Sequence, residues 1–292
     1  MTLPFTTYRL NLPGRQVTID HPWVMGIINV TPDSFYGGSR VDDEQALVGR
    51  VQEMLEAGAE VLDLGACSTR PGSLSVDART EMERLKWALK IIRREAPWAI
   101  VSVDTFRADV ARRCVEECFA DIVNDVSGGT LDSDMFSTMA RLRVPYILTH
   151  MRGTPAIMSR MNSYRDVADD VCKWLAQRIA MLRDMGLTDV IADPGFGFAK
   201  DTGQNYELLA ALGDFHSLGV PLLAGLSRKR MIYDLLGITP AEALNGTTVA
   251  NTIALLQGVH ILRVHDVQAA IQAVRITAML RHGQNKHELT NE

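Results

Sequence analysis

The 292-residue sequence contains little cysteine, lacks a long unbroken apolar run and has no excess of basic residues. Its four cysteines form neither CxxC pairs nor a dense pattern, which is typical of a reducing compartment. A long apolar stretch at 249–264 is interrupted by polar residues, so it does not reach the roughly 20 residues that span a bilayer. Residues 1–20 have neither a basic leader nor an apolar core. We therefore expect a cytoplasmic protein with no membrane partner.

The formal net charge of −5 disfavours nucleic acid as a partner, because a phosphate backbone requires a basic surface. Any anionic substrate must instead be bound by local cations. The length suits one α/β barrel, and the 47% hydrophobic content is ordinary for a globular protein. A core of this size needs no disulfide or structural metal.

Eight short apolar runs recur at intervals typical of strand–helix units. They cover residues 24–28, 61–64, 100–103, 122–123, 146–148, 190–192, 222–226 and 259–262. Amphipathic stretches alternate with them, at 42–57, 76–95, 107–118, 133–142, 164–185, 206–212, 241–257 and 267–281. This alternation predicts a (β/α)8 TIM barrel with parallel strands and outer helices. A doubly wound open sheet shares the periodicity, but its usual G-x-G-x-x-G turn after the first strand is absent.

The chain divides into three segments on this pattern. Residues 1–22 contain an alternating stretch around Asn11-Leu12-Pro13-Gly14, which predicts a β-hairpin that caps one end of the barrel. Residues 23–283 form the barrel. The polar tail 284–292 is expected to be disordered.

Nearly every apolar run ends in a polar residue, and in a (β/α)8 barrel these ends converge on one mouth. The acidic and amide ends are Asp104, Asn124 and Asp193, and the cationic ends include Lys229, Arg263 and His265. A carboxylate can accept two N–H groups side by side, which suits a 2-amino-pyrimidinone edge such as that of a pterin or guanine. Phe198 and Met151 could wall such a ring. Each carboxylate could instead cap a helix or pair with a cation.

Two loops after the first and second strands are also candidates for the site. Residues 29–39, which include Asp33 and Phe35, form a longer loop than the usual 2 to 6 residues, although Asp33 could simply be a cap. Residues 65–72 place hydroxyls and Arg70 beside glycines, which suits a diphosphate, although a solvated turn is the alternative. Cys67 in this loop has no histidine beside it in sequence, so we interpret it as non-catalytic.

Together these segments resemble the dihydropteroate synthase family. The matching segments, in the family's order, are 25–35, 68–72, 102–105, 124–125, 150–151, 193–198, 227–229 and 263–267. The resemblance implies a homodimeric barrel that joins 6-hydroxymethyl-7,8-dihydropterin diphosphate to p-aminobenzoate. The products would be 7,8-dihydropteroate and pyrophosphate, in folate biosynthesis.

The resemblance also implies roles for individual residues. A pterin would be bound by Asp104, Asn124, Met151, Asp193, Phe198, Lys229 and Arg263. Its diphosphate would be bound by Asn29, Thr69, Arg70, Arg263 and His265, with Asn29 also ligating Mg2+. The p-aminobenzoate and lid positions would be Phe35, Thr69, Arg70, Pro71, Phe198 and Lys229. The catalytic set would be Lys229, Asp104, Asp193, Arg263, His265 and Asp33.

Two positions depart from the family pattern. Tyr36-Gly37-Gly38 follows Phe35, where many members carry a further aspartate, and Cys67 stands where a glutamate is frequent. If the missing carboxylate helps to stabilise a cation in the family, Asp33 must act without it here.

Two other functions are compatible with this fold. Pterin-binding methyltransferases, which pass a methyl group from a folate to a corrinoid, share the barrel and the pterin carboxylates but do not need the two loops. A catalytically silent pterin-binding barrel would be expected to have lost its anion-site residues, whereas all of them are present in this sequence.

Overall fold

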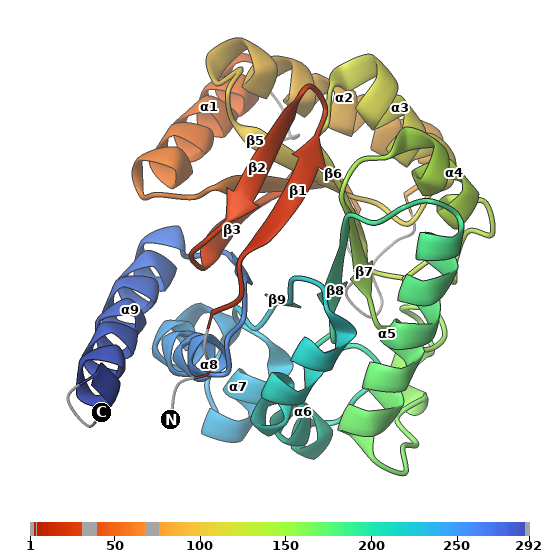
Figure 1. The fold of residues 1–292 in the computed structure, drawn as a ribbon. Coiled ribbons are helices and arrows are strands. Elements are labelled where there is room, and N and C mark those ends of the chain that lie inside the picture. Colours follow the sequence, from red (N-terminus) through yellow and green to blue (C-terminus); the bar gives the residue numbers. More distant parts are fainter. Residues whose placement is uncertain (1–2, 4, 31–39, 68–75, 290–292) are drawn as a thin grey trace.

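Each of the eight predicted apolar runs contributes a strand to one parallel sheet in the computed structural model, which describes residues 3, 5–30, 40–67 and 76–289. The strands are β3 (Trp23–Asn29), β4 (Val61–Gly65), β5 (Ile100–Asp104), β6 (Ile122–Asp125), β7 (Tyr146–Thr149), β8 (Val190–Asp193), β9 (Leu223–Ala224) and β10 (Ile261–Val264). Neighbouring strands pair in the order β8-β7-β6-β5-β4-β3-β10-β9. A parallel bridge between Ala192 and Leu222 joins the two outer strands (Figure 1). The sheet therefore closes, and the predicted (β/α)8 barrel is confirmed.

Helices connect the strands on the outside of the barrel (Figure 1). They are α1 (Arg40–Glu56), α2 (Ala78–Glu95), α3 (Ala108–Cys118), α4 (Met135–Leu142), α5 (Val167–Asp184), α6 (Thr202–Ala210), α7 (Arg230–Leu236), α8 (Leu244–Leu256) and α9 (Val267–Leu289), with 3-10 turns η1 (Met158–Arg160), η2 (Leu212–Leu218) and η3 (Pro240–Glu242). Our prediction omitted α7, because two turns are too short to show an apolar period. The tail that we expected from residue 284 begins within α9. Over the described part of the chain, no helix has both the length and the apolarity that crossing a membrane requires.

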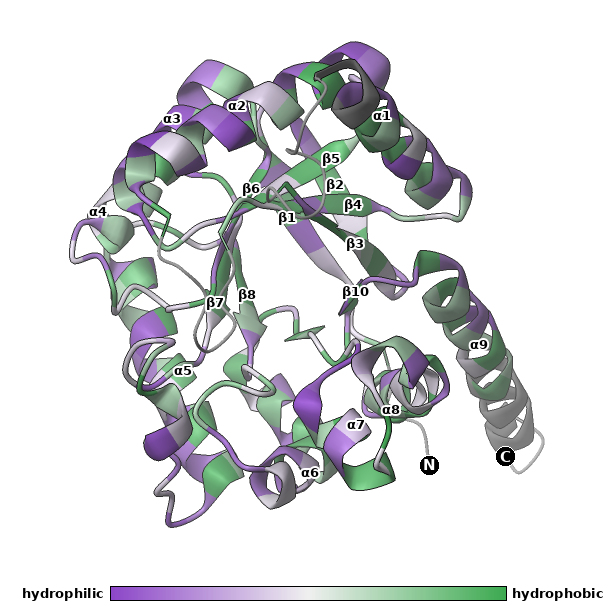
Figure 2. Ribbon diagram, turned by 180° about the vertical axis from the view of Figure 1, so that it is seen from behind, coloured by the Kyte–Doolittle hydropathy of each residue, from purple (hydrophilic) through white to green (hydrophobic). Residues whose placement is uncertain are grey.

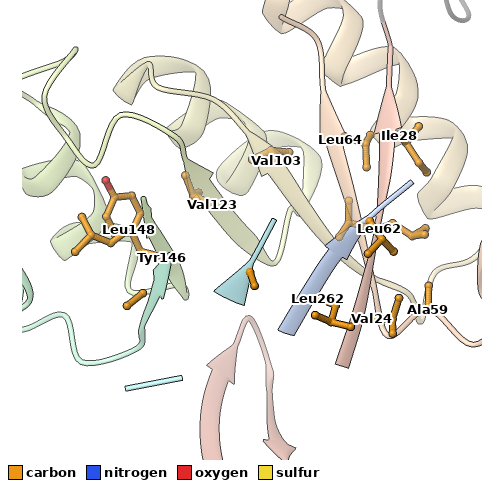
Figure 3. Packing of buried hydrophobic residues seen from close by; sticks show 14 of the residues in the cluster. Val24, Ile28, Ala59, Leu62, Leu64, Val103, Val123, Tyr146, Leu148 and Leu262 are labelled. Atoms are coloured by element: carbon orange, nitrogen blue, oxygen red, sulfur yellow. The ribbon is translucent and has the colours of Figure 1, made fainter. Parts of the chain in front are cut away.

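Side chains alternate between the two faces of the barrel strands. The outward residues, among them Val24, Leu62, Val103 and Leu148, pack in the main hydrophobic core between sheet and helices (Figure 3). Figure 2 shows hydrophilic and hydrophobic residues interspersed along α2 and α3, and their buried residues, such as Leu85, Leu89 and Val110, join the same core. A second buried cluster fills the barrel interior near the strand starts, and it includes Met25, Val61, Ile122, Ile147, Ile191 and Ile261.

The amino-terminal hairpin closes the end of the barrel at which the strands begin. β1 (Tyr8–Leu12) and β2 (Arg15–Ile19) pair antiparallel, and Gly14 takes a φ of 77° in the turn. Leu10, Leu12 and Ile19 alternate with exposed residues and join the second buried cluster. The hairpin thus covers the apolar end of the interior, as predicted, and the opposite end is the mouth.

Candidate active site

Strand register aligns polar residues across four neighbouring strands at the mouth. Asn29 of β3 pairs with Gly65 of β4, Gly65 pairs with Asp104 of β5, and Asp104 pairs with Asn124 of β6. A Cβ added at Gly65 would lie 3.6 Å from Asn29 Oδ1 and 3.7 Å from Asp104 Cβ. The absence of a side chain at Gly65 therefore leaves space between Asn29 and Asp104.

Arg263 of β10 forms two ion pairs across this mouth. Its Nε donates to Asp63 Oδ2 at 2.6 Å, and its Nη2 donates to Asp104 Oδ2 at 2.7 Å. Asn124 Nδ2 donates to the same Asp63 oxygen at 3.1 Å. Burial raises the pKa of Asp104, and the Asp63 charge adds to this effect while Arg263 opposes it. Burial disfavours charge on Arg263, but the two carboxylates outweigh burial and raise its pKa, so the guanidinium remains charged.

The prediction from sequence missed Asp63, which is fully buried in the middle of β4. The pattern predicts functional residues only where the apolar runs end, and Asp63 lies inside the run at 61–64. The period of two would have revealed it, because Asp63 shares its face of the strand with Gly65 and Val61.

Asp193 ends β8 and is held by the loop that follows. Its Oδ1 accepts from the backbone N–H of Gly195 at 2.8 Å, and its Oδ2 accepts weakly from Thr149 Oγ1 at 3.4 Å. Burial raises the pKa of Asp193, whereas the Gly195 N–H and the Lys229 cation oppose that shift. Gly195 has a φ of 71°, and a Cβ there would lie 2.1 Å from the carbonyl oxygen of His150. Only glycine fits at this position.

Lys229 lies against the loop that carries Phe198. Its Nζ is 4.5 Å from the centroid of the Phe198 ring, a cation–π distance. Burial lowers the pKa of Lys229 to about 8, although the Asp193 charge opposes the shift. Phe198 in turn packs with Met151 in a small apolar cluster. The structure therefore brings an aromatic ring, a thioether and an ammonium group together beside Asp193.

His265 follows β10 and is oriented by Ser227. The Ser227 hydroxyl lies 3.0 Å from His265 Nδ1 and also accepts from the His265 backbone N–H at 3.1 Å. Burial, aided by the Arg263 charge, lowers the pKa of His265 to about 4, so the imidazole is neutral at pH 7. Arg228, the residue after Ser227, instead pairs with Asp266 at 2.9 Å and is not part of the cluster at the mouth.

The remaining predictions concern the loops after β3 and β4. Burial raises the pKa of Cys67 to about 12, so its thiol is protonated at neutral pH, in line with a non-catalytic residue. Asp33, Phe35, Thr69, Arg70 and Pro71 lie outside the described residues. Within the described ranges, no cluster of three His, Cys, Asp or Glu side chains could hold a metal ion.

Comparison with known proteins agrees with this geometry. Residues 25–265 match the family model described as pterin binding enzyme. Dihydropteroate synthase of Escherichia coli K12 is 38% identical over 282 residues, which cover 95% of this chain and 99% of the relative. The Yersinia pestis dihydropteroate synthase, solved with a sulfonamide drug complex, superimposes with a TM-score of 0.86 at 33% identity, covering 94% of this chain and 100% of that chain. The Xanthomonas albilineans enzyme, solved with 4-aminobenzoic acid, gives a TM-score of 0.84 at 38% identity, covering 94% and 99%.

A closed parallel barrel with carboxylates and cations gathered at its mouth, matched by this family model, defines a pterin-binding barrel enzyme. The three relatives above are all named dihydropteroate synthase, a transferase, and are 33–38% identical to this chain. The chain belongs to the dihydropteroate synthase family.

The loop after β8 yields a first prediction. Gly195→Ala should destabilise the protein by about 3 kcal/mol or more, because the new Cβ meets a backbone carbonyl in addition to the left-handed strain. Gly186→Ala is the matched control, since Gly186 has a φ of 88° and no atom within 4 Å of an added Cβ. This control should cost only about 1 kcal/mol. Urea unfolding measures both, and equal losses would contradict the proposed close approach to His150.

Proposed function

We propose that this chain condenses 6-hydroxymethyl-7,8-dihydropterin diphosphate with p-aminobenzoate, giving 7,8-dihydropteroate and pyrophosphate in folate biosynthesis. One observation carries the proposal: buried acidic and amide side chains share the barrel mouth with three cationic or imidazole side chains. The first set is Asp104, Asn124 and Asp193, and the second is Lys229, Arg263 and His265. Such a mouth suits a ligand with an N–H-rich ring at one end and an anion at the other. The relatives' shared name and the 4-aminobenzoic acid complex support this choice of substrates.

The acidic side of the mouth binds the pterin ring in this proposal. Asp193 uses Oδ1 to accept from Gly195, and among the described residues its one other hydrogen bond is the long contact with Thr149, so it retains acceptor capacity for ring N–H groups. Asp104 engages Arg263 through Oδ2 alone among the described residues, which leaves Oδ1 to accept. Phe198 and Met151 pack against the pterin ring, and Lys229 donates a hydrogen bond to an acceptor on that ring.

The cationic side stabilises the leaving group. In the reaction the methylene carbon–oxygen bond breaks, the electron pair leaves with pyrophosphate, and the amine of p-aminobenzoate forms the new carbon–nitrogen bond and loses a proton. Arg263 keeps its charge throughout, so it presents a fixed cation where negative charge grows. His265, neutral and oriented by Ser227, contributes a hydrogen bond to the diphosphate.

We assign Mg2+ to the diphosphate, with Asn29 as its protein ligand. The Asn29 amide oxygen lies at the mouth beside the open space above Gly65. Mg2+ prefers oxygen donors and usually binds through one or two protein oxygens, with the substrate phosphates and water completing its shell. When bound, the ion would supply further positive charge to the departing pyrophosphate.

The reaction itself is the second prediction. Purified protein mixed with both substrates and Mg2+ should release pyrophosphate only when p-aminobenzoate is present, and chelation of Mg2+ should suppress this release. Asp193→Asn should reduce turnover by about 100-fold, because a lost charged acceptor costs about 3 kcal/mol. Lys173→Met, on the exposed face of α5, is the control and should turn over normally. Release without p-aminobenzoate would refute the reaction, and methyl transfer to a corrinoid would favour the methyltransferase alternative.

The pH dependence of pterin binding is the third prediction. The pKa of Lys229 is lowered to about 8, so its ammonium is charged below pH 8 and neutral above it. Affinity for the pterin diphosphate, measured by calorimetry without p-aminobenzoate, should therefore fall above about pH 8. Lys229→Arg stays charged at high pH and should lose this alkaline fall, whatever its absolute affinity. If affinity still falls above pH 8 in the arginine variant, the fall belongs to the titration of a group other than Lys229.

We propose that two copies of this chain associate through α7, α8 and α9. These helices lie side by side (Figure 2). Their exposed apolar side chains are Leu235, Leu236, Leu244, Val249, Ile253, Ile276, Met279 and Leu280. A face of this extent on one side of the barrel is more typical of an interface than of a solvated surface.

The fourth prediction concerns this face. Val249→Glu should convert a homodimer to a monomer in sedimentation velocity, since it buries an unpaired charge at the interface. Met181→Glu changes an equally exposed methionine on α5 and should leave the dimer intact. A wild-type protein that sediments as a monomer at all concentrations would refute the dimer.

A cytoplasmic location fits the state of the cysteines. All four are free thiols, and Cys114 and Cys118 are buried against the core as expected of packing residues. Free thiols of this kind are typical of a reducing compartment.

A further inference from the structure

Lys200 is a buried lysine near the end of the loop that connects β8 to α6, and its side chain folds back onto the same loop. Its Nζ donates to the carbonyl oxygens of Gly195 at 2.9 Å and Phe198 at 3.1 Å, and it lies 3.0 Å from His150 Nδ1. These three partners match the three N–H groups of an ammonium. Neither the strand ends nor the motifs of the sequence pointed to this residue.

His150, which follows β7, completes the arrangement from the neighbouring strand. While Lys200 is charged it can only donate, so in that state His150 Nδ1 is the acceptor and the ring proton is on Nε2. Burial lowers the pKa of His150 to about 2, so the ring is neutral, and its edge packs on Trp174 with centroids 4.9 Å apart. The His150 backbone N–H also donates to the carbonyl oxygen of Asp193 at 2.9 Å. His150 therefore fixes Lys200 relative to both strand ends.

The loop held by this pair has little regular structure of its own. Gly195, Gly197 and Ala199 all take left-handed φ angles, of 71°, 79° and 52°. This alternation turns the Gly195 and Phe198 carbonyls inward to Lys200, while the Phe198 ring faces Lys229. The Gly195 carbonyl also accepts from the Phe198 backbone N–H at 3.1 Å, whereas Lys200 is the one donor to the Phe198 carbonyl among the described residues. Leaving that carbonyl without a donor would cost about 1–3 kcal/mol, so the Lys200 ammonium stabilises this conformation.

We propose that Lys200 and His150 form a positioning pair that holds Phe198 and Asp193 in place for the pterin ring without touching the ligand. This proposal rests on the proposed function, because it assigns the loop to the pterin. It differs from a general structural role in one respect: loss of the pair should weaken the binding of the pterin diphosphate, which depends on both Asp193 and Phe198, far more than the binding of p-aminobenzoate, which depends on Phe198 alone of the two.

The fifth prediction tests this selectivity with Lys200→Met, which keeps length and removes the donors. We expect the KM for the pterin diphosphate to rise by about 10-fold, the equivalent of one lost net hydrogen bond, with kcat and the KM for p-aminobenzoate changed by less than about threefold. His150→Leu should have a similar effect, because it removes the acceptor. His150→Asn should restore most of the affinity, because its amide oxygen can accept near the position of Nδ1.

Calorimetric titration with the pterin diphosphate alone, together with thermal unfolding, completes the test. Lys173→Met, an exposed lysine on α5, is the matched control and should match wild type. If Lys200→Met does not fold, the two His150 variants provide the test. Weaker pterin binding in His150→Leu than in His150→Asn supports the positioning pair, and equal binding in the two variants contradicts it. A wild-type protein without synthase activity would refute the proposed function, whereas an active wild type with an unchanged pterin KM in Lys200→Met and His150→Leu would overturn the positioning pair alone.

Discussion

Arg263, placed between the buried carboxylates of Asp63 and Asp104, is the interaction on which the mouth of the barrel depends. It connects β10 with β4 and β5, and the Asp63 oxygen that it shares with Asn124 extends the network to β6. Removing one partner of such a buried pair typically costs about 3–5 kcal/mol, because a charge is left uncompensated in a poorly solvated interior. The same geometry keeps a permanent cation at the place where a departing anion needs one. The ion pairs of Arg263 therefore both connect the strands and place a positive charge at the mouth.

The interior of the barrel can hold these charges because its inward residues are apolar at one end and polar at the other. Along β3 the inward residues change from Met25 through Ile27 to Asn29, and along β10 they change from Ile261 to Arg263. The apolar half, closed by the hairpin, buries side chains that need no polar partner. This half supplies the hydrophobic free energy, so the polar half can tolerate carboxylates whose pKa values burial raises.

Much of this arrangement could be predicted from the sequence, because the period of two and the strand–helix alternation depend only on local patterning. All eight strands and the convergence of Asp104, Asn124, Asp193 and Arg263 follow from it. The remainder depends on tertiary contacts. Asp63 was missed inside an apolar run, and α7 was missed because it is short. Lys200 was missed because its inward direction depends on the fold of its own loop and on His150, 50 residues away after β7, and no local pattern encodes that contact.

Lys200 and Lys229 show why residue type alone cannot assign a role in this mouth. Lys200 is buried and Lys229 is partly buried; desolvation lowers their pKa values to about 7 and about 8, and the Asp193 charge opposes both shifts. Lys200 directs its N–H groups to two carbonyls and an imidazole, so its donors are used within the protein. Lys229 faces the Phe198 ring, and among the described residues no hydrogen bond engages its ammonium. An ammonium whose donors are satisfied stabilises a conformation, whereas one that faces an aromatic ring and makes no hydrogen bond to the described residues retains donors for a ligand. The direction of the N–H groups, rather than the charge, separates the positioning lysine from the binding one.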